Sequence, residues 1–324
     1  MKVLITGGTG FVGSHLIDRL LEDPDAEIHA LVRNPAKARR FEGKPRVRLL
    51  EGDLHALPGL PSGLSVVFHL AGLTKTNKPK QYYTVNEAGT ASLFRALARS
   101  GGSPRVVYAS SQAAEGPSAP GRPSREDDPP RPVSPYGVSK LGGEREALAF
   151  KDRFPLTILR VCAVYGPGDE DFLEFFRCLR KGFLPLYGRR RKSLSLCHVR
   201  DVARAFHLAA AAQTGSGEIF NIAAPRPVTW DEMGETAARI LGRKVVRVRI
   251  PAWAAFVGCA AGDAAGRLRG RATAVNLGKY RDMKPDNWVA DVRKAREVLG
   301  FEAGISLEDG LRETLDWYVR NGLL

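Results

Sequence analysis

Short apolar runs alternate with longer amphipathic segments through the first half of the chain. The runs are mostly apolar on both sides, as parallel strands buried between two helical layers are. The segments between them space apolar residues three or four positions apart, which predicts helices. This alternation predicts an α/β fold with a doubly wound parallel sheet. The predicted strands are residues 3–5, 28–32, 47–50, 66–70, 106–108 and 156–161, and the predicted helices are residues 14–21, 85–99 and 137–149.

The regular alternation ends near residue 165. Residues 218–222 read as a last strand of the main sheet, after helices at residues 171–181 and 201–212. Mixed patterns at residues 230–241, 244–250 and 307–319 indicate a second, smaller unit. We therefore expect a large domain of residues 1–165 plus about 198–224, and a smaller C-terminal mixed α/β lobe of about 166–197 plus 225–324.

Residues 251–262 form one apolar segment, PAWAAFVGCAAG. It is shorter than the stretch of about 18 apolar residues that marks a membrane-spanning helix, and no run of that length occurs elsewhere. We expect it to be a buried helix of the small lobe. A wall of an apolar substrate pocket and a membrane contact are the alternatives.

The 324 residues carry a formal net charge of +14. Basic surfaces are more often solvated than bound to nucleic acid, so we expect no nucleic-acid partner. One basic cluster stands out, Arg189 to Lys192. The four cysteines are scattered, which predicts free thiols in a reducing, cytoplasmic compartment, and no metal site.

A glycine-rich turn joins the first strand to the first helix, in the sequence TGGTGFVG. Glycines at this spacing allow a tight turn, a close approach of a pyrophosphate and close packing of helix on strand. The helix start adds N–H donors and a positive dipole end. The sequence thus predicts a Rossmann-type dinucleotide site at Gly7, Gly10, Phe11, Val12 and Gly13.

The end of the second strand contacts the adenosine ribose in such folds, and a carboxylate there favours NAD. This chain has Arg33 instead, followed by further basic residues. Because arginine suits a 2′-phosphate, we expect NADP(H) to be preferred, with NAD(H) as the alternative. Further coenzyme contacts are expected after the third and fourth strands, at Asp53, Leu54, Leu70, Ala71 and Gly72.

Tyr136 and Lys140 lie four positions apart in the segment SPYGVSK, hence on one face of a helix. Ser110 and Ser111 end the fifth strand, at the edge where open α/β sheets bind ligands. Hydride transfer at a carbonyl carbon also moves a proton at its oxygen. A tyrosine whose pKa is lowered by a nearby lysine can move that proton, and a serine hydroxyl can hold the oxygen.

The motifs TGGTGFVG, GDL, HLAG, VNEAGT, VVYASS, SPYGVSK and VYGPGD occur in the order seen in extended short-chain dehydrogenase/reductases, also called the NAD-dependent epimerase/dehydratase superfamily. The chain resembles this family over essentially its whole length. The resemblance implies catalytic roles for Ser111, Tyr136 and Lys140. It also implies that Asn86 and the backbone at Ala163 and Val164 lie near the coenzyme.

Two features bear on the substrate. Many nucleotide-sugar enzymes of the family have a diphosphate-binding arginine shortly before the motif that is HVRD here, whereas this chain has Ser193 to Cys197 and a basic cluster slightly earlier. Glu115 replaces a tyrosine common in the epimerases, and the dense acids of GPGDEDF are also unusual for them. The chain looks closest to the hydroxysteroid-dehydrogenase and dihydroflavonol-reductase branch.

We therefore predict an NAD(P)-dependent oxidoreductase acting on a secondary alcohol or ketone, a small-molecule substrate. In this reading the large domain binds the dinucleotide and the smaller lobe binds substrate. The alternative is a nucleotide-sugar epimerase or dehydratase, and a less favoured one is a coenzyme sensor without catalysis. A homodimer through helices of the large domain is expected only by analogy with the family.

Overall fold

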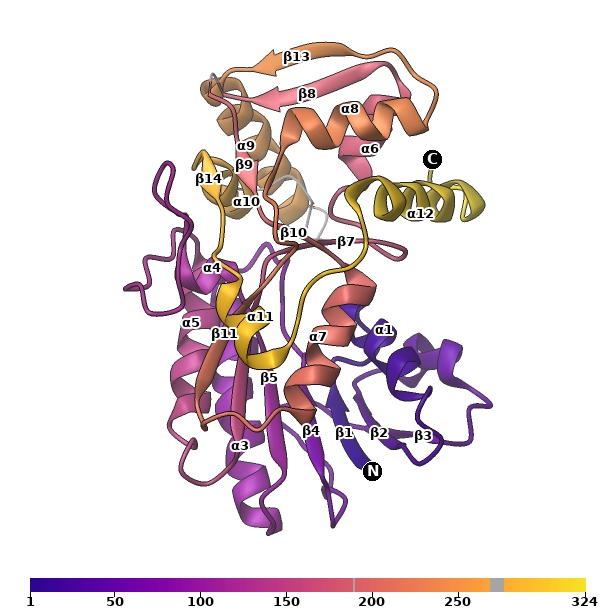
Figure 1. The fold of residues 1–324 in the computed structure, drawn as a ribbon, viewed down its shortest axis with the longest axis vertical. Coiled ribbons are helices and arrows are strands. Elements are labelled where there is room, and N and C mark those ends of the chain that lie inside the picture. The colour runs from indigo at the N-terminus through magenta and orange to yellow at the C-terminus, as the bar shows by residue number, and fades with distance from the viewer. Residues whose placement is uncertain (189, 269–276) are drawn as a thin grey trace.

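The computed structural model describes residues 1–188, 190–268 and 277–324. Its centre is a seven-stranded parallel sheet in the order β11-β6-β5-β4-β1-β2-β3 (Figure 1). This confirms the predicted α/β class with a doubly wound sheet. The strands are β1 (Lys2–Thr6), β2 (Glu27–Val32), β3 (Val47–Glu51), β4 (Val66–His69), β5 (Arg105–Ser111), β6 (Leu156–Val161) and β11 (Glu218–Ile222).

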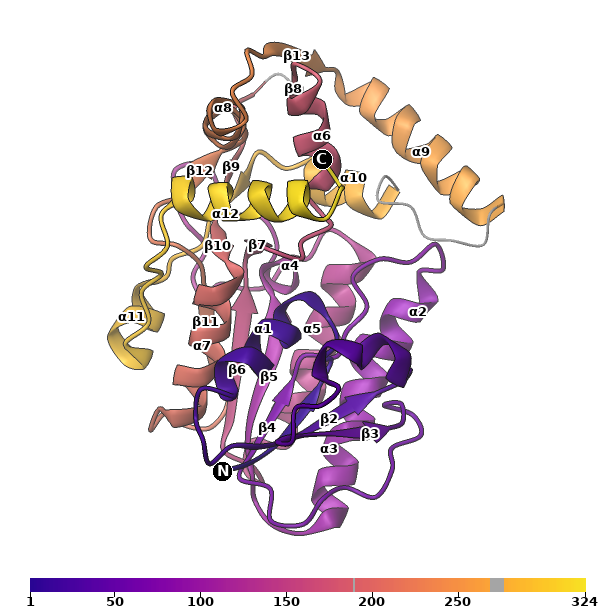
Figure 2. The ribbon, with the colours of Figure 1, turned by 90° about the vertical axis from the view of Figure 1, so that its right-hand side faces the viewer.

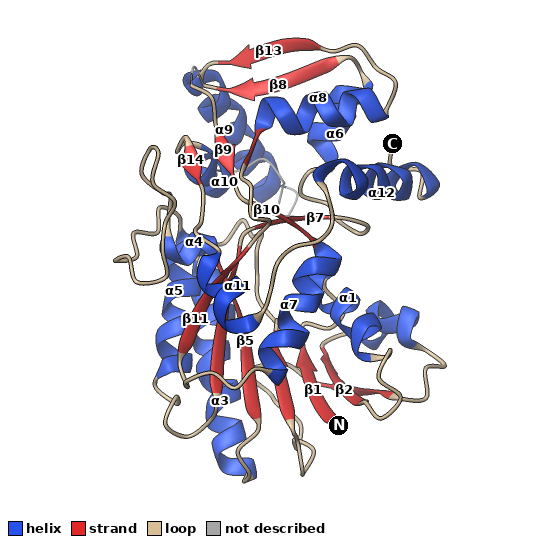
Figure 3. Ribbon diagram, in the orientation of Figure 1, coloured by secondary structure: helices blue, strands red, loops and turns tan. Residues whose placement is uncertain are grey.

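Helices cover both faces of this sheet (Figure 3). Alternation along β1 divides its side chains between two cores, since Val3 and Ile5 face one layer and Leu4 the other. The first layer contains α1 (Phe11–Leu20), α7 (Val199–Ala211) and α11 (Arg293–Leu299). The second contains α3 (Gly89–Ser100) and α5 (Pro135–Leu148). Short elements connect them: a 3-10 helix (Pro35–Phe41), α2 (Lys80–Tyr82), a π-helical stretch (Tyr83–Ala88) and α4 (Gln112–Glu115).

The smaller lobe lies beyond the carboxyl ends of the strands and has its own aromatic core. Phe176, Leu184, Met233 and Tyr318 are among the side chains buried there. Its helices are α6 (Leu173–Arg180), α8 (Trp230–Ile240), α9 (Ala252–Leu268), α10 (Leu277–Met283) and α12 (Leu307–Arg320). Its strands are β7 (Ala163–Tyr165), β8 (Phe183–Tyr187), β9 (Ser193–Leu194), β10 (Leu196–His198), β12 (Val228–Thr229), β13 (Val246–Ile250) and β14 (Asn287–Trp288). The four cysteines are free, as expected.

Strand β8 is an element that sequence patterning missed. It contains Pro185 and follows a helix closely, so no strand signal stands out. It forms because it pairs in parallel with β13, far along the chain, as the edge of a two-stranded sheet. The helix expected to begin near residue 85 also starts earlier, since α2 and the π-helical stretch lead directly into α3.

The expectation that residues 251–262 form a buried helix is wrong in its main part. The segment is helical, but Trp253, Phe256 and Val257 are 72%, 47% and 57% exposed. Cys259 alone is buried among the large apolar side chains of residues 251–262. Helix α9 runs along the outside of the small lobe, where neighbouring elements cover one side of it (Figure 2). No helix in the described part of the chain is long and apolar enough to cross a membrane.

Candidate active site

The glycine-rich turn shapes the start of α1 as a phosphate site requires. Gly7 has a φ of +76°, and a Cβ there would lie 2.5 Å from the backbone nitrogen of Ala71. A Cβ on Gly13 would collide with the carbonyl oxygen of Gly7. The N-terminus of α1 has no side-chain cap and no acidic residue in its first turn. Its N–H groups are therefore available to an anion, and the turn fits the pyrophosphate of a dinucleotide.

The loop after β4 is fixed against this turn by a buried histidine. The Nδ1 atom of His69 lies 2.7 Å from the hydroxyl of Thr6, and its Nε2 atom lies 3.0 Å from the hydroxyl of Thr90. Burial lowers the pKa of His69 to about 3, so the ring is neutral. The Thr6 hydroxyl also accepts from the backbone N–H of Ala71 at 3.2 Å. His69 thus positions the segment Leu70 to Gly72 next to Gly7, a role that sequence reasoning did not assign.

Asn86 ties the same loop to the catalytic helix. Its Oδ1 accepts from the N–H of Leu73 at 2.7 Å, while its Nδ2 donates to the Leu73 carbonyl at 3.0 Å and to the Ser139 hydroxyl at 2.9 Å. The side chain is fully buried. Its amide contacts protein on both sides, so Asn86 acts here as a positioning residue.

Ser111, Tyr136 and Lys140 meet at the carboxyl edge of the sheet. Ser111 is the last residue of β5 and caps α4, accepting from the N–H of Ala113 at 3.2 Å. Ser134 caps α5, which places Tyr136 in its first turn, where the neighbouring Ser111 side chain lowers the pKa of the Tyr136 hydroxyl. Lys140 is 4% exposed and donates from Nζ to the Ala109 carbonyl at 2.5 Å. The structure thus brings together the three side chains that the sequence singled out.

The protonation states of this set suit a proton donor. Burial raises the pKa of Tyr136 to about 12, the hydrogen bond from Ser111 opposes the rise, and Asp282 and Asp171 add to it. Burial lowers the pKa of Lys140 to about 8, against the attraction of Glu144. The expected lowering of the tyrosine pKa is therefore outweighed by burial in this structure. At neutral pH, Tyr136 keeps its proton while Lys140 is an ammonium.

The surroundings of Tyr136 include groups that the sequence did not single out. The ring of Tyr82 meets the Tyr136 ring edge-on, with centroids 5.9 Å apart. Asp282 of α10 hydrogen bonds with Ser134, and burial raises the pKa of its carboxyl; its Oδ1 is buried with no hydrogen-bond partner. Asp171 forms an ion pair with Lys75. Two carboxylates close to the catalytic hydroxyl disfavour an anionic group in the same place.

A buried ionic network lies behind the catalytic strand. Arg160 donates to both oxygens of Glu144, at 2.9 and 2.8 Å, and its Nη1 lies 3.5 Å from Glu115. The Ser110 hydroxyl donates to Glu144 at 2.5 Å, and the Ser124 hydroxyl donates to Glu115 at 2.7 Å. The network joins β6 and α4 to β5 and α5, which carry the three side chains of the candidate site.

The remaining predicted coenzyme residues lie around the carboxyl edge in different settings. Arg33 follows β2 and is exposed, whereas Arg40 is committed to an ion pair with Asp18. Asp53 forms a turn, its Oδ1 accepting from the N–H of His55 at 2.8 Å. Leu54 is buried beside Gly89. Ala163 and Val164 are half-buried on β7.

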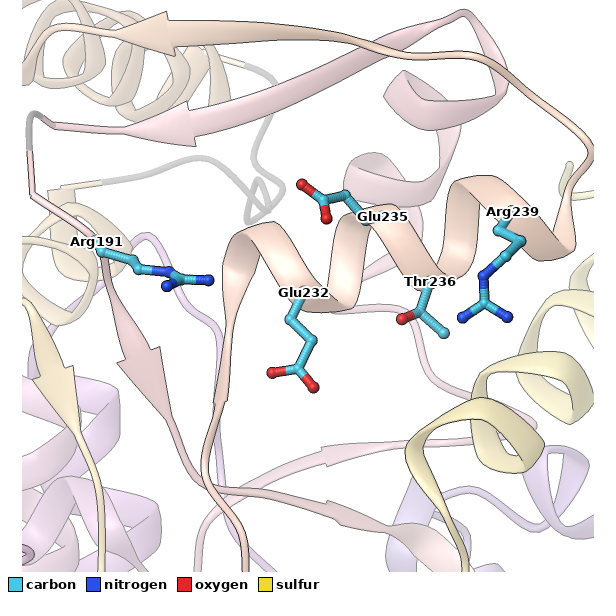
Figure 4. Close-up of a pocket in the computed structure, with 5 residues that line it drawn as sticks. All are labelled: Arg191, Glu232, Glu235, Thr236 and Arg239. Atoms are coloured by element: carbon cyan, nitrogen blue, oxygen red, sulfur yellow. The ribbon is translucent and has the colours of Figure 1, made fainter.

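The basic cluster is not placed at the catalytic tyrosine. Lys192 donates to the carbonyls of Lys284 and Pro285 and to the carboxylate of Asp286. Its ammonium is therefore paired within the protein and is not available to an anionic ligand. Arg191 lines a surface pocket with four residues of α8, and the catalytic residues do not line it (Figure 4). Arg189 lies outside the described residues. Residues 193–197 contain no cation, and Leu194 among them is buried in the small-lobe core.

Comparison with known proteins adds to this geometry. Residues 3–223 match the NAD dependent epimerase/dehydratase family. The chain is 31% identical to the ceramide reductase of Caulobacter vibrioides, over 99% of this chain and 96% of that protein. It is 27% identical to the UDP-glucose 4-epimerase of Mycolicibacterium smegmatis, over 98% of each. A solved structure of MoeE5 in complex with UDP-glucuronic acid and NAD is 31% identical, with a TM-score of 0.78 over 99% of this chain and 100% of that one.

Proposed function

This chain belongs to the NAD dependent epimerase/dehydratase family, as its motifs predict, and from that membership we propose that it interconverts a secondary alcohol and a ketone. The observation that carries the proposal is that Ser111 and Tyr136 are neighbours at the carboxyl edge of the sheet, with Lys140 one helical turn away. A protein that only senses the coenzyme would not require these three side chains together. In this proposal the large domain holds the dinucleotide and the smaller lobe holds the substrate.

The protein's own residues have separate tasks in the reaction. Tyr136, protonated at neutral pH, donates its proton to the carbonyl oxygen during reduction, and Ser111 holds that oxygen by a hydrogen bond. Lys140, charged and hydrogen bonded to the Ala109 carbonyl, has its Nζ beside Gly72 of the expected coenzyme loop. The uncapped start of α1 would hold the pyrophosphate, and Leu70 to Gly72 would line the coenzyme. A bound nicotinamide dinucleotide supplies or accepts the hydride.

We propose a ketone without a nucleoside diphosphate as the leading substrate class. Residues 193–197 contain no cation, and the nearby Lys192 donates to Asp286. The carboxyls of Asp171 and Asp282 disfavour an anion beside Tyr136. The similarity to a protein named ceramide reductase supports reduction of a ketone.

Nucleotide-sugar epimerisation or dehydration is the second candidate, and the comparisons weigh more for it than for the first. A UDP-glucose 4-epimerase is similar over almost the whole chain, and the MoeE5 structure holds UDP-glucuronic acid. In such a reaction the same Tyr136 would take the proton of a sugar hydroxyl and return a proton to the keto intermediate, while a bound coenzyme would take up and give back the hydride within one cycle.

Coenzyme consumption separates the two candidates. We expect the purified full chain to oxidise one added NAD(P)H for each ketone reduced, when offered aliphatic ketones with long chains. We expect no conversion of UDP-glucose or UDP-glucuronic acid. The variant Tyr136→Phe is the control for contaminating reductases. Conversion of a UDP-sugar without added coenzyme would overturn the leading proposal in favour of the second.

Arg33 carries the proposed preference for NADP(H). We expect NADPH to bind more tightly than NADH, because the exposed guanidinium at the end of β2 pairs with a 2′-phosphate. The variant Arg33→Ala should weaken NADPH binding about tenfold or more and leave NADH binding unchanged. Dissociation constants measured by fluorescence titration test this, with Arg99→Ala on α3 as a control. Tighter binding of NADH by the unaltered protein, as the NAD in the MoeE5 structure suggests, would contradict it.

A further inference from the structure

The small lobe exposes apolar side chains in one region. Twelve large apolar side chains are exposed in the described part of the chain, and six of them belong to β8, β13 and the first turns of α9. We call these six the apolar surface; they are Phe183, Val246, Val248, Trp253, Phe256 and Val257. Patches of this kind mark interaction sites.

The pairing of β8 with β13 turns one apolar face outward. Arg247 reaches Glu235 and Asp231 on α8, so that side of β13 faces the lobe. Because side chains alternate along a strand, Val246 and Val248 face the other way. Phe183 lies beside Val246 in the register of the two strands. Phe183, Val246 and Val248 therefore form an apolar, exposed part of the outer face of this small sheet.

Helix α9 continues this surface directly from the end of β13. Trp253, Phe256 and Val257 follow the spacing of one helical face, and residues 250–262 contain no charged side chain. An apolar helix is normally buried on all sides, yet α9 lies at the outside of the lobe (Figure 2). Tryptophan is the side chain most suited to the boundary between water and lipid.

The segments that carry the apolar surface are basic, and the acidic partners of some of their cations, such as Glu235 and Asp286, lie on neighbouring elements. Residues 181–192 and 242–262 together contain nine lysines and arginines and no aspartate or glutamate. Exposed cations border the surface at both ends of the two strands: Lys181, Arg243, Lys244, Arg190 and Arg191. A partner for this region must therefore bury apolar side chains and carry negative charge.

We propose that this surface docks on a lipid bilayer that contains anionic lipids, with Trp253, Phe256 and Val257 entering the headgroup region. An anionic bilayer supplies both an apolar interior and negative headgroups, which the two features require together. A symmetric pair of chains would bring two such basic surfaces face to face, which like charge disfavours. A nucleic acid is a poorer partner, because its phosphodiester backbone has no apolar surface that could bury Val246, Val248 and Val257.

The docking surface is connected to the catalytic region. Asn77, in the loop after β4, donates to the carbonyl of Gly266 in α9 at 3.3 Å. The Phe256 ring packs edge-on against Tyr280 of α10, the helix that carries Asp282 near Tyr136. Docking would thus place α9 and α10 next to the bilayer, and α10 carries Asp282, which lies near Tyr136. An amphiphilic ketone resides in such a bilayer. The docking itself does not depend on the proposed function.

Vesicle binding tests the proposal on the full chain. We expect sedimentation with vesicles of phosphatidylcholine mixed with phosphatidylglycerol, little binding to phosphatidylcholine alone, and loss of binding at high salt. The double variant Arg243→Gln/Lys244→Gln should bind about 25-fold more weakly, at about fivefold for each cation. The double variant Trp253→Glu/Val257→Glu should not bind.

Two controls match these changes in exposure and charge. Val319→Glu, on α12 and 56% exposed, and Arg99→Gln, on α3, should bind like the unaltered chain. Circular dichroism confirms that each variant is folded, and the activity assay is run separately, so that failure of docking and failure of the proposed function are distinguished. Equal binding by all variants, no binding to anionic vesicles, or self-association that Trp253→Glu abolishes would each overturn the proposal.

Discussion

Replacing Tyr136 by phenylalanine is expected to reduce turnover by a factor of about 10² to 10⁴, close to complete loss, with nearly unchanged affinity for the coenzyme. The change removes one hydroxyl from a half-buried ring and leaves the helix start, Ser134 and Pro135 intact. Coenzyme binding depends on the glycine turn and on Lys140, which donates to Ala109 and not to Tyr136. Kinetics with a ketone substrate and coenzyme titration measure the two effects separately.

Tyr82 provides the matched control for this change. Its ring contacts the Tyr136 ring, and its hydroxyl donates to the Thr74 carbonyl at 3.3 Å, away from Ser111. The variant Tyr82→Phe should therefore retain activity within a few-fold of the unaltered enzyme. Full turnover by Tyr136→Phe, or equal losses in both variants, would refute the assignment of Tyr136 as the proton donor.

The strands, helices and glycine turn of the large domain could be predicted from the sequence, because the local signals there agree with the final structure. Apolar runs, the glycine turn and the tyrosine four residues before the lysine each depend on near neighbours in the chain. The sheet order then places the end of β5 and the start of α5 side by side. The direction of the tyrosine pKa could not be predicted, since it depends on burial and on Asp282 and Asp171, which approach from the other lobe.

The small lobe was harder to predict because its elements depend on distant partners. Strand β8 pairs with β13, which lies far along the chain. Asp282 approaches Ser134 from α10, and no local pattern in the sequence predicts that approach. The apolar segment of α9 illustrates the same limit. Its composition predicts burial, but composition cannot tell whether protein or another apolar medium covers a helix.

The buried network around Arg160 carries the largest expected effect on stability. Replacing Arg160 by methionine leaves the carboxyls of Glu144 and Glu115 buried without their cation, and we expect a loss of about 3–5 kcal/mol in the free energy of unfolding. The three side chains are 2–3% exposed, so solvent cannot replace the guanidinium. Arg122→Met is the control, because its side chain is 60% exposed and its ion pair with Asp128 should contribute little to stability.

The pH dependence of this loss identifies its cause. Burial already raises the pKa of Glu115 to about 7, and removal of Arg160, which lowers it, should raise it further. A carboxyl whose pKa is higher in the folded than in the unfolded state destabilises the fold increasingly as pH rises above its unfolded pKa. Below about pH 7 Glu115 is protonated in both folded chains, so the difference between Arg160→Met and the unaltered chain should grow from about pH 7 upward in denaturant titrations. A loss independent of pH would mean that Arg160 stabilises the protein by packing alone, and that the carboxyls behind Ser111 do not need its charge.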